Sequence, residues 1–170
     1  MDQAQRQKLE ERLGYHFNDP EKLVRALTHP TYSKETREDR HNPCECLDQS
    51  VYATLGDAVL KLGLTQILIE MKLKTKRSIT DSKKDLENNF YLAQVGERFR
   101  LLEDQLIFHT IKNETKLSEE SPAILSDTLE ALIGAIYLDN GNSMTDINKC
   151  IRKVFSTELE KLEKNSPLCN

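Results

Sequence analysis

The sequence predicts an all-α fold, with a single domain over residues 1–165 and a short tail at residues 166–170. Three observations support this fold class. Apolar residues recur at the three-and-four spacing of a helix over residues 125–137, and a similar apolar run covers residues 55–68. Residues that start and end helices recur between such runs. With 38% hydrophobic and 31% charged residues, a chain of 170 residues can bury one substantial core and is too short for two ordinary domains.

Boundary residues predict the first two helices. Residues 5–13 form a short amphipathic pattern that ends at Gly14, a residue type that commonly closes helices. Asp19 and Pro20 suit the N-cap and the first position of a second helix. Its apolar face would consist of Leu23, Val24 and Leu27. The polar and charged residues 33–43 predict an exposed connection.

The middle of the chain predicts two long helices. The first spans about residues 47–71, and the second runs from about residue 83 to residue 98 after an N-cap within residues 78–81. The second helix has several apolar residues available for burial: Leu86, Phe90, Leu92, Ala93 and Val95. Residues 101–107 predict either a short helix or an extended segment.

Two further helices are predicted in the last third of the chain. Residues 113–121 are polar and predict a loop, after which Pro122 would open the most apolar helix. Asn140 and Gly141 would end that helix. A last amphipathic helix spans about residues 144–162.

Three acidic residues lie inside these apolar helices. Asp127 and Glu130 are three positions apart, which places both carboxylates on one side of a helix, and Asp57 lies within the other apolar run. Because an ionised carboxylate is costly to bury, a divalent cation is one of the few partners that would stabilise such a group. The two helices could therefore converge on one metal site. Alternatively, Asp127 is a first-turn acid favoured by the helix dipole and Glu130 lies on a solvated edge.

The net charge of −4 gives no general excess of positive charge that would indicate binding to nucleic acid. Six basic residues nevertheless fall within thirteen positions, namely Lys72, Lys74, Lys76, Arg77, Lys83 and Lys84. Such a run is usually a solvated loop and helix start. Only its position relative to the carboxylates could make it a surface that contacts phosphate.

Nothing in the sequence indicates a membrane or secreted protein. No apolar run reaches the length of a membrane span, and the N-terminus Met-Asp-Gln-Ala-Gln-Arg-Gln lacks the apolar core of a signal peptide. We therefore expect a cytoplasmic protein without a membrane partner. The four cysteines do not make a disulfide framework and are interpreted as reduced thiols, with redox sensitivity of Cys44 and Cys46 as the alternative.

Other candidate residues have simpler structural interpretations. His29 lies near a helix end and far in sequence from the acids, which favours a structural role over that of a catalytic base. Tyr52 and Tyr137 occupy apolar helical positions and predict core or dimer contacts. The residues that could bind zinc have no evident fourth ligand: they are His41, Cys44 and Cys46.

Four stretches of the chain form an ordered set of motifs. They are Leu27-Thr28-His29, the Leu-Gly-Asp-Ala-Val-Leu of residues 55–60, residues 86–93 with two asparagines, and residues 126–139. In order and approximate spacing, these stretches resemble the catalytic domain of the ribonuclease III family. The resemblance covers roughly residues 8–160, and its most specific part is the last stretch.

The resemblance implies an all-α endonuclease domain that forms a homodimer and cuts double-stranded or structured RNA during RNA processing. In that family, the helix with Leu-Gly-Asp and the helix with Asp-x-x-Glu supply carboxylates that bind metal and act in catalysis. The matching residues here are Asp57, Asp127 and Glu130. The implied cofactor is Mg²⁺, with Mn²⁺ as a substitute, because a hard cation prefers oxygen ligands and can bridge carboxylates to a phosphate.

The chain departs from the family pattern at two positions. The family usually has Glu four and seven residues before the Asp of Leu-Gly-Asp, where this chain has Ala53 and Ser50. Asp48 would lie about half a turn out of phase and would not replace them. A site with three carboxylates could be completed by water and substrate phosphate, at the cost of a higher demand for metal. The alternative is a catalytically weakened member that acts as an RNA-binding or scaffold protein.

Many family members also carry a separate domain that binds double-stranded RNA, which these 170 residues do not contain. We therefore expect the catalytic domain and its dimer partner to hold the RNA through Lys83 and Lys84, or with an accessory RNA-binding protein. A competing class is a helical scaffold that forms a homodimer and whose acids are surface or capping groups.

Overall fold

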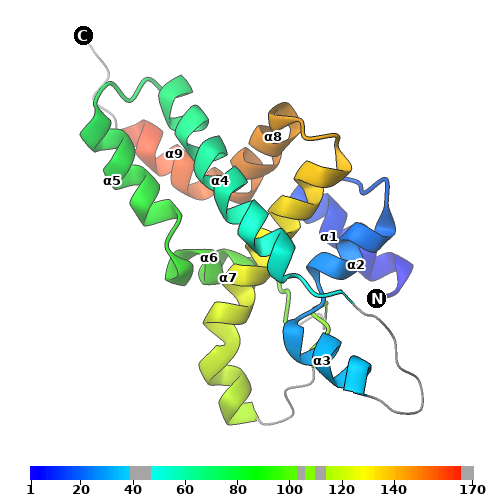
Figure 1. The fold of residues 1–170 in the computed structure, drawn as a ribbon. Helices are drawn as coiled ribbons and strands as arrows, with labels where there is room; N and C mark the ends of the chain where they lie inside the picture. Colours follow the sequence, from blue (N-terminus) through cyan, green and yellow to red (C-terminus); the bar gives the residue numbers. More distant parts are fainter. Residues whose placement is uncertain (39–46, 103–105, 110–113, 166–170) are drawn as a thin grey trace.

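Two long helices, α4 (Ser50–Glu70) and α7 (Glu114–Asp139), cross near the middle of the molecule, and the other helices pack around them (Figure 1). The computed structural model describes residues 1–38, 47–102, 106–109 and 114–165. The contact between α4 and α7 is the most extensive one between any two described helices, and α6 and α2 also pack against α7.

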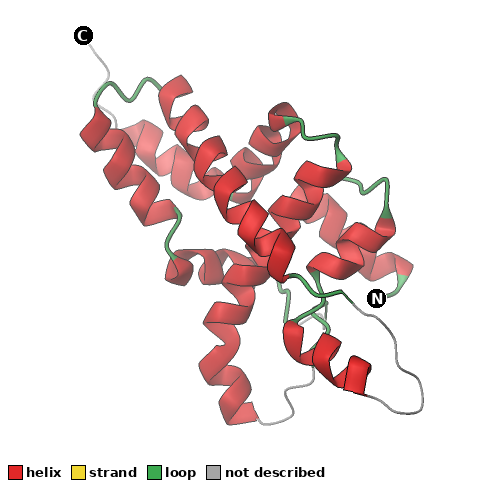
Figure 2. Ribbon diagram, in the orientation of Figure 1, coloured by secondary structure: helices red, strands yellow, loops and turns green. Residues whose placement is uncertain are grey.

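The described residues form helices joined by short loops, which confirms the predicted all-α class (Figure 2). Besides α4 and α7, these helices are α1 (Gln3–Leu13), α2 (Pro20–Ala26), α3 (Pro30–Glu38), α5 (Lys76–Leu86), α6 (Asn89–Arg98), α8 (Met144–Val154) and α9 (Ser156–Asn165). An isolated parallel bridge between Thr28 and Phe108 ties the α2–α3 junction to the segment before α7.

The apolar periodicity of both central helices is buried as predicted. The buried apolar residues of α7 include Leu125, Leu129, Ala131, Leu132, Ile133, Ala135 and Ile136, each at most 2% exposed. In α4, Leu60 and Leu64 are fully buried, and Tyr52 is buried as well. Tyr137 is half-buried and packs against the same core. The core therefore lies along the crossing of the two helices.

Several predicted helix ends are confirmed by their backbone geometry. Gly14 closes α1 with φ 73°, and Gly141 follows α7 with φ 72°, both in the left-handed region that glycine tolerates best. Asp19 caps α2, because its side chain accepts a hydrogen bond from the backbone N–H of Glu21 at 2.9 Å.

The prediction of an exposed connection over residues 33–43 was wrong for its first part, which belongs to α3. Pro30 begins α3, and His29 caps it by accepting a hydrogen bond at Nδ1 from the backbone N–H of Thr31 at 3.3 Å. Residues 39–43 lie outside the described residues. Val24 was also assigned wrongly to the buried face of α2, because it is 42% exposed.

The helix predicted over residues 83–98 is two helices. Asn88 separates them: its side-chain amide donates to the carbonyl oxygen of Asp85 at 2.7 Å, and its side-chain oxygen accepts from the N–H of Tyr91 at 2.8 Å. An asparagine that bonds to the backbone on both sides competes with a continuous helix. The preceding helix α5 begins at a Thr75 cap, earlier than expected. Phe90, expected in the core, is 71% exposed.

Pro122 does not open α7 but lies inside it, so the loop predicted over residues 113–121 was wrong from residue 114 onward. Proline removes the N–H that would bond to the carbonyl of Ser118. The hydroxyl of Ser121 donates to that carbonyl oxygen at 3.0 Å instead. The last predicted helix, residues 144–162, is likewise divided into α8 and α9 at the fully buried Phe155.

The C-terminal end of α7 is held by Asp139, whose side chain is fully buried. Its carboxylate accepts hydrogen bonds from the Tyr15 hydroxyl at 2.8 Å and from the backbone N–H groups of Asn18 and Asp19 at 2.7 and 3.0 Å. Lys22 adds an ion pair at 3.2 Å. Hydrogen bonds and this cation outweigh burial and keep the pKa of Asp139 below its ordinary value.

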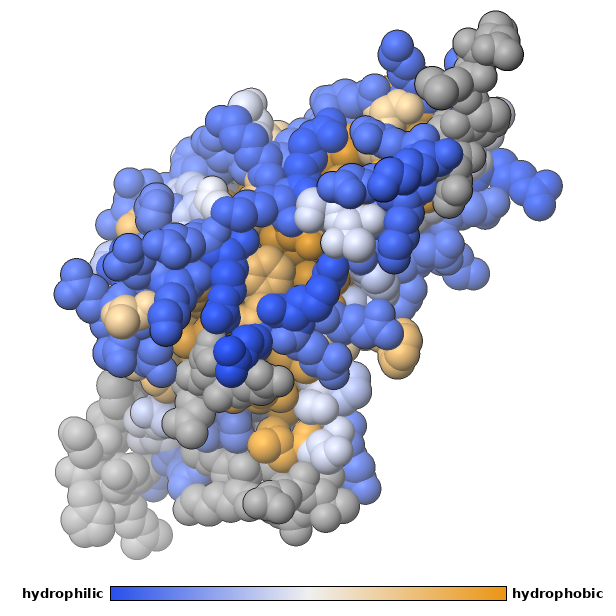
Figure 3. Space-filling view, turned by 180° about the vertical axis from the view of Figure 1, so that it is seen from behind, coloured by the Kyte–Doolittle hydropathy of each residue, from blue (hydrophilic) through white to orange (hydrophobic). Residues whose placement is uncertain are grey.

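The surface behind the view of Figure 1 is mostly hydrophilic, with apolar residues visible in a hollow near its centre (Figure 3). Among the described residues, no helix combines the length and the apolar character that crossing a membrane requires.

Candidate active site

Helices α4 and α7 touch through glycines at their crossing. A Cβ atom on Gly56 would lie 1.8 Å from the carbonyl oxygen of Glu130, and one on Gly134 would lie 2.2 Å from the carbonyl oxygen of Tyr52. Only residues without a side chain allow the two backbones to come this close. Because Asp57 follows Gly56, this contact brings the carboxylates of Asp57 and Glu130 to the same place.

A cavity of about 380 Å³ opens beside this crossing. Asp57, Asp127 and Glu130 all line it, so the structure brings together the three acids predicted from the sequence. Ala53 and Ser50 line the same cavity one and two turns before Asp57. The remaining lining residues are Pro30, Gln49 and Thr54.

Two hydrogen bonds of the buried residue Gln49 hold the start of α4 at the cavity wall. Gln49 is 1% exposed; its backbone N–H donates to the carbonyl oxygen of Thr28 at 2.9 Å, and its side-chain oxygen accepts from the Thr128 hydroxyl at 3.1 Å. This link holds the first turn of α4 against the segment of α7 that carries Asp127. Sequence reasoning missed Gln49, because a polar residue before a helix usually reads as a solvated cap.

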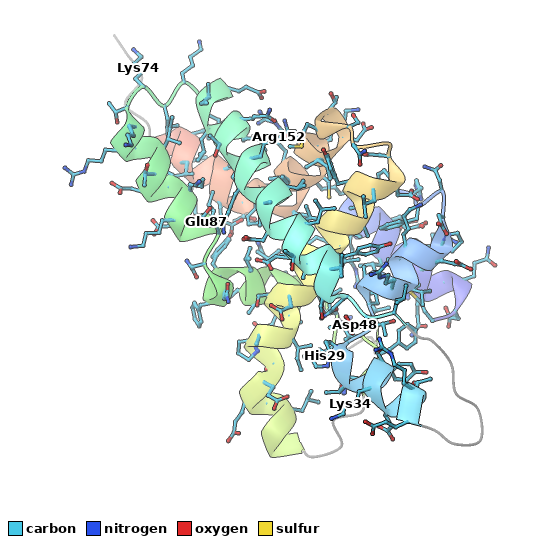
Figure 4. All side chains as sticks on the ribbon, viewed as in Figure 1. His29, Lys34, Asp48, Lys74, Glu87 and Arg152 are labelled. Atoms are coloured by element: carbon cyan, nitrogen blue, oxygen red, sulfur yellow. The ribbon has the colours of Figure 1, made fainter. Side chains whose placement is uncertain are left out.

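Asp48 does not line the cavity, as its helical phase predicted. Its side chain accepts a hydrogen bond from the backbone N–H of Ser50 at 3.0 Å and lies 4.0 Å from Arg37. Figure 4 shows Asp48 close to the start of α4 and His29 between α3 and α7. His29 caps α3, and its ring also interacts electrostatically with the cavity acid Asp127, although the two residues are far apart in sequence. Burial, and then the neighbouring His109, lower the pKa of His29.

Negative charge is concentrated in the cavity. Burial, followed by the charges of Asp57 and Asp127, raises the pKa of Glu130 to about 7, and Lys61 opposes this shift. Asp127 is more exposed, yet partial burial still raises the pKa of its carboxyl. A cation bound in the cavity would favour the ionised form of both groups.

A lysine missed by the sequence analysis lies beside these acids. The Lys61 ammonium donates a hydrogen bond to Asp57 Oδ2 at 2.8 Å. The spacing of four residues between Asp57 and Lys61 on one helix was the available signal.

The predicted RNA contacts Lys83 and Lys84 do not line the cavity. Lys83 lies 3.8 Å from Glu87, which follows α5, and Lys84 is exposed. Glu87 interacts electrostatically with Lys61, so the Lys83–Glu87 pair lies on the Lys61 side of the site. Lys74 and Asp48 lie toward opposite ends of α4 (Figure 4), which separates the start of the basic run from the cavity.

The potential zinc ligands His41, Cys44 and Cys46 lie outside the described residues. Among the described residues, Cys150 of α8 is a buried free thiol.

Comparison with known proteins settles the family. A sequence model of a family described as ribonuclease-III-like matches residues 19–158. This chain belongs to the ribonuclease-III-like family. The match includes both central helices and all three cavity acids, so the family assignment rests on the part of the chain that forms the site.

Proteins named ribonuclease 3 or ribonuclease III are similar to this chain in sequence and in structure. Ribonuclease 3 of Campylobacter jejuni (strain RM1221) is 32% identical over 162 residues, which cover 95% of this chain and 62% of the relative. The chain thus spans less than two thirds of that relative. The nuclease domain of ribonuclease III from Campylobacter jejuni superposes with a TM-score of 0.68 and 28% identity, covering all of both chains.

A second structure of that nuclease domain, with a TM-score of 0.66 and 28% identity, covers 95% of this chain and 98% of its own. It was described for structural flexibility in a region involved in dimer formation.

Proposed function

We propose that this chain is the nuclease part of a cytoplasmic, metal-dependent endoribonuclease that hydrolyses phosphodiester bonds in double-stranded or structured RNA. The observation that carries the proposal is the convergence of Asp57, Asp127 and Glu130 from two helices on one cavity. Family membership and relatives named ribonuclease 3 support the reaction class.

The donor set suits Mg²⁺, or Mn²⁺ in its place. Carboxylate oxygens are the ligands that hard cations prefer, and a cation would offset the repulsion that raises the pKa of Glu130. Among the described residues, no three His, Cys, Asp or Glu side chains already form a metal-holding cluster. A cation held in the cavity would therefore need water and substrate phosphate to complete its ligands.

Asp57, Asp127 and Glu130 would hold the cation. When bound, it would supply an activated water and stabilise the charge that develops on the phosphate. The residues of this chain have distinct tasks around it. The glycine contact between α4 and α7 sets the separation of Asp57 and Glu130. Glu130, with a pKa of about 7, would exchange a proton with solvent at neutral pH as the cation enters or leaves.

Ser50 and Ala53 explain why the site should demand more metal than other family members. Both line the cavity at the positions where the ribonuclease III pattern usually has Glu. Ala53 offers no oxygen and Ser50 offers only a hydroxyl. The same observation favours the alternative, a member that binds RNA or a protein partner without cutting it.

A homodimer would bring two such cavities to one RNA. The outer face of α4 carries Val51, Leu62 and Ile69, which are 63%, 49% and 57% exposed and lie in one line along the helix. We propose that a second copy of the chain covers this stripe. Leu62→Glu should then yield a monomer in sedimentation, whereas Lys84→Glu, which changes α5 and not α4, should leave the dimer intact.

Incubating the purified protein with long double-stranded RNA across Mg²⁺ and Mn²⁺ concentrations tests the proposed reaction. The Asp127→Asn, Glu130→Gln double variant is the control, since it keeps the shape of both side chains and removes their charge. Cleavage by the wild type alone would support a nuclease with three carboxylates. Bound but uncut RNA at every metal concentration would favour the non-catalytic alternative.

A further inference from the structure

Lys61 lies among three acids that come from different parts of the fold. It follows Asp57 by about one turn of α4, and its Nζ is 2.8 Å from Asp57 Oδ2. Its charge also interacts with Glu130 of α7 and with Glu87, which follows α5. The ammonium thus lies where the negative potential of the cavity and that of the α5 end overlap.

An ion pair between residues four apart on a helix is usually only a surface contact, but this pair includes an acid that lines the cavity. Asp57 lines the cavity, and the ammonium contacts Oδ2, one of the two carboxylate oxygens that Asp57 could offer to a metal. Neither partner is fully exposed, with side chains 44% and 38% exposed for Lys61 and Asp57. The hydrogen bond to Asp57 is also the main reason why the pKa of Lys61 is raised.

We propose that Lys61 is a built-in counter-cation of the candidate active site, which holds Asp57 in the metal-free protein and must leave Asp57 Oδ2 before a divalent cation can use that oxygen. This inference rests on the proposed metal-dependent function. Lys61 is therefore a positioning residue that sets the metal demand of the site. When all three cavity carboxylates are ionised, they and the ammonium beside Asp57 have a formal charge of −2, which a single divalent cation would neutralise.

The test measures metal binding rather than cleavage. Mn²⁺ is titrated into the full chain at fixed pH and ionic strength, and binding is followed by calorimetry and by the rise in melting temperature. Lys61→Met keeps the apolar stem and removes the ammonium. We expect the half-saturating Mn²⁺ concentration of this variant to fall about tenfold, because the charge-assisted hydrogen bond of Lys61 no longer competes with Mn²⁺ for Asp57. A tenfold change in affinity corresponds to about 1.4 kcal/mol.

Two matched variants distinguish competition at Asp57 from a general change in charge. Lys61→Arg retains a cation at the same position and should stay within about twofold of the wild type. Lys83→Met removes one positive charge from the pair with Glu87 and leaves the hydrogen bond between Lys61 and Asp57 in place. It should also change Mn²⁺ affinity by less than about twofold. If Lys61→Met does not fold, Lys61→Gln replaces it.

Unchanged or weaker Mn²⁺ binding by Lys61→Met would overturn the inference, as would an equal gain from Lys83→Met. If the wild type binds Mn²⁺ and cleaves RNA, either result leaves the proposed function intact. If neither the wild type nor Lys61→Met binds Mn²⁺, both proposals fail. Binding by Lys61→Met alone would support the inference most strongly.

Discussion

Replacing Gly56 with alanine tests whether the glycine contact builds the site. The added Cβ would lie 1.8 Å from the carbonyl oxygen of Glu130 and 2.9 Å from the backbone nitrogen of Gly134. An ordinary contact begins near 3.4 Å, so α4 and α7 would have to separate locally by about 1.6 Å. Both obstacles are backbone atoms of a buried helix, which no side-chain rotation can move.

The expected cost follows from this geometry. Overpacking at a well-packed contact costs about 3 kcal/mol when the neighbouring atoms cannot yield. Alanine in place of glycine within a helix returns about 1 kcal/mol. Gly56→Ala should therefore lower the free energy of unfolding by at least about 2 kcal/mol. For a chain of this size, that corresponds to a fall of about 4–8 °C in melting temperature.

Gly63→Ala is the matched control on the same helix, seven residues later. Its Cβ would meet Ile151 Cδ1 at 2.3 Å and Asn148 Oδ1 at 3.0 Å, which are both ends of side chains that can turn away. We expect its free energy of unfolding to stay within about 1 kcal/mol of the wild type, because repacking is largely offset by helix propensity.

Urea unfolding followed by circular dichroism measures both variants, and Mn²⁺ titration reports on the site. Gly56→Ala should also lose most of its stabilisation by Mn²⁺, because Asp57 and Glu130 would move apart. Equal stability of the two variants would refute the idea that backbone contact at Gly56 determines this crossing.

Four further predictions concern charge. The pKa of Glu130 is raised from 4.5 to about 7 in the folded protein, so its ionisation opposes folding. The free energy of unfolding of the metal-free protein should therefore fall as the pH rises from about 4.5 to 7. This dependence on pH should be weaker in Glu130→Gln. Folding lowers the pKa of Asp139, so Asp139→Asn should reduce the free energy of unfolding by about 2–3 kcal/mol at neutral pH. This loss should disappear as the pH falls below 3.8, the ordinary pKa of the carboxyl. A loss that stays constant across pH in urea unfolding would contradict the prediction. Ala53→Glu adds a carboxylate to the cavity wall and should reduce half-saturating Mn²⁺ by about tenfold in calorimetry, whereas weaker binding would show that the wall has no room for it. Charge reversal of both Lys83 and Lys84 should weaken RNA binding without altering the circular dichroism spectrum. The slope of the logarithm of the RNA-binding constant against the logarithm of salt concentration should fall in magnitude by about two. Unchanged affinity in low salt would exclude these two lysines as RNA contacts.

Local chemistry was enough to predict several features of this chain. Helix class, the Asp19 cap and the closing glycines Gly14 and Gly141 depend on residues within one turn, so the sequence contains all the relevant information. The buried face of α7 follows from the 3.6-residue period. The acids were found because a charged residue inside an apolar helix is unusual.

Errors in the predicted elements arose where side chains bond to the backbone in ways that composition does not reveal. Asn88 divides one predicted helix by bonding to the backbone on both sides. Ser121 lets Pro122 remain inside α7 by satisfying the carbonyl that proline leaves without a donor. Phe90 has the right residue type for a core position, but it follows the new helix start at Asn88 and points outward.

By itself, the sequence determined that this chain is helical and that Asp57, Asp127 and Glu130 lie on two apolar helices. Only the tertiary structure decided that the three carboxylates share one cavity, that Ser50 and Ala53 face it, and that an ammonium holds one of the acids. The physical reason is that helical periodicity is local. The crossing of α4 and α7 depends instead on Gly56 meeting a backbone carbonyl more than seventy residues away.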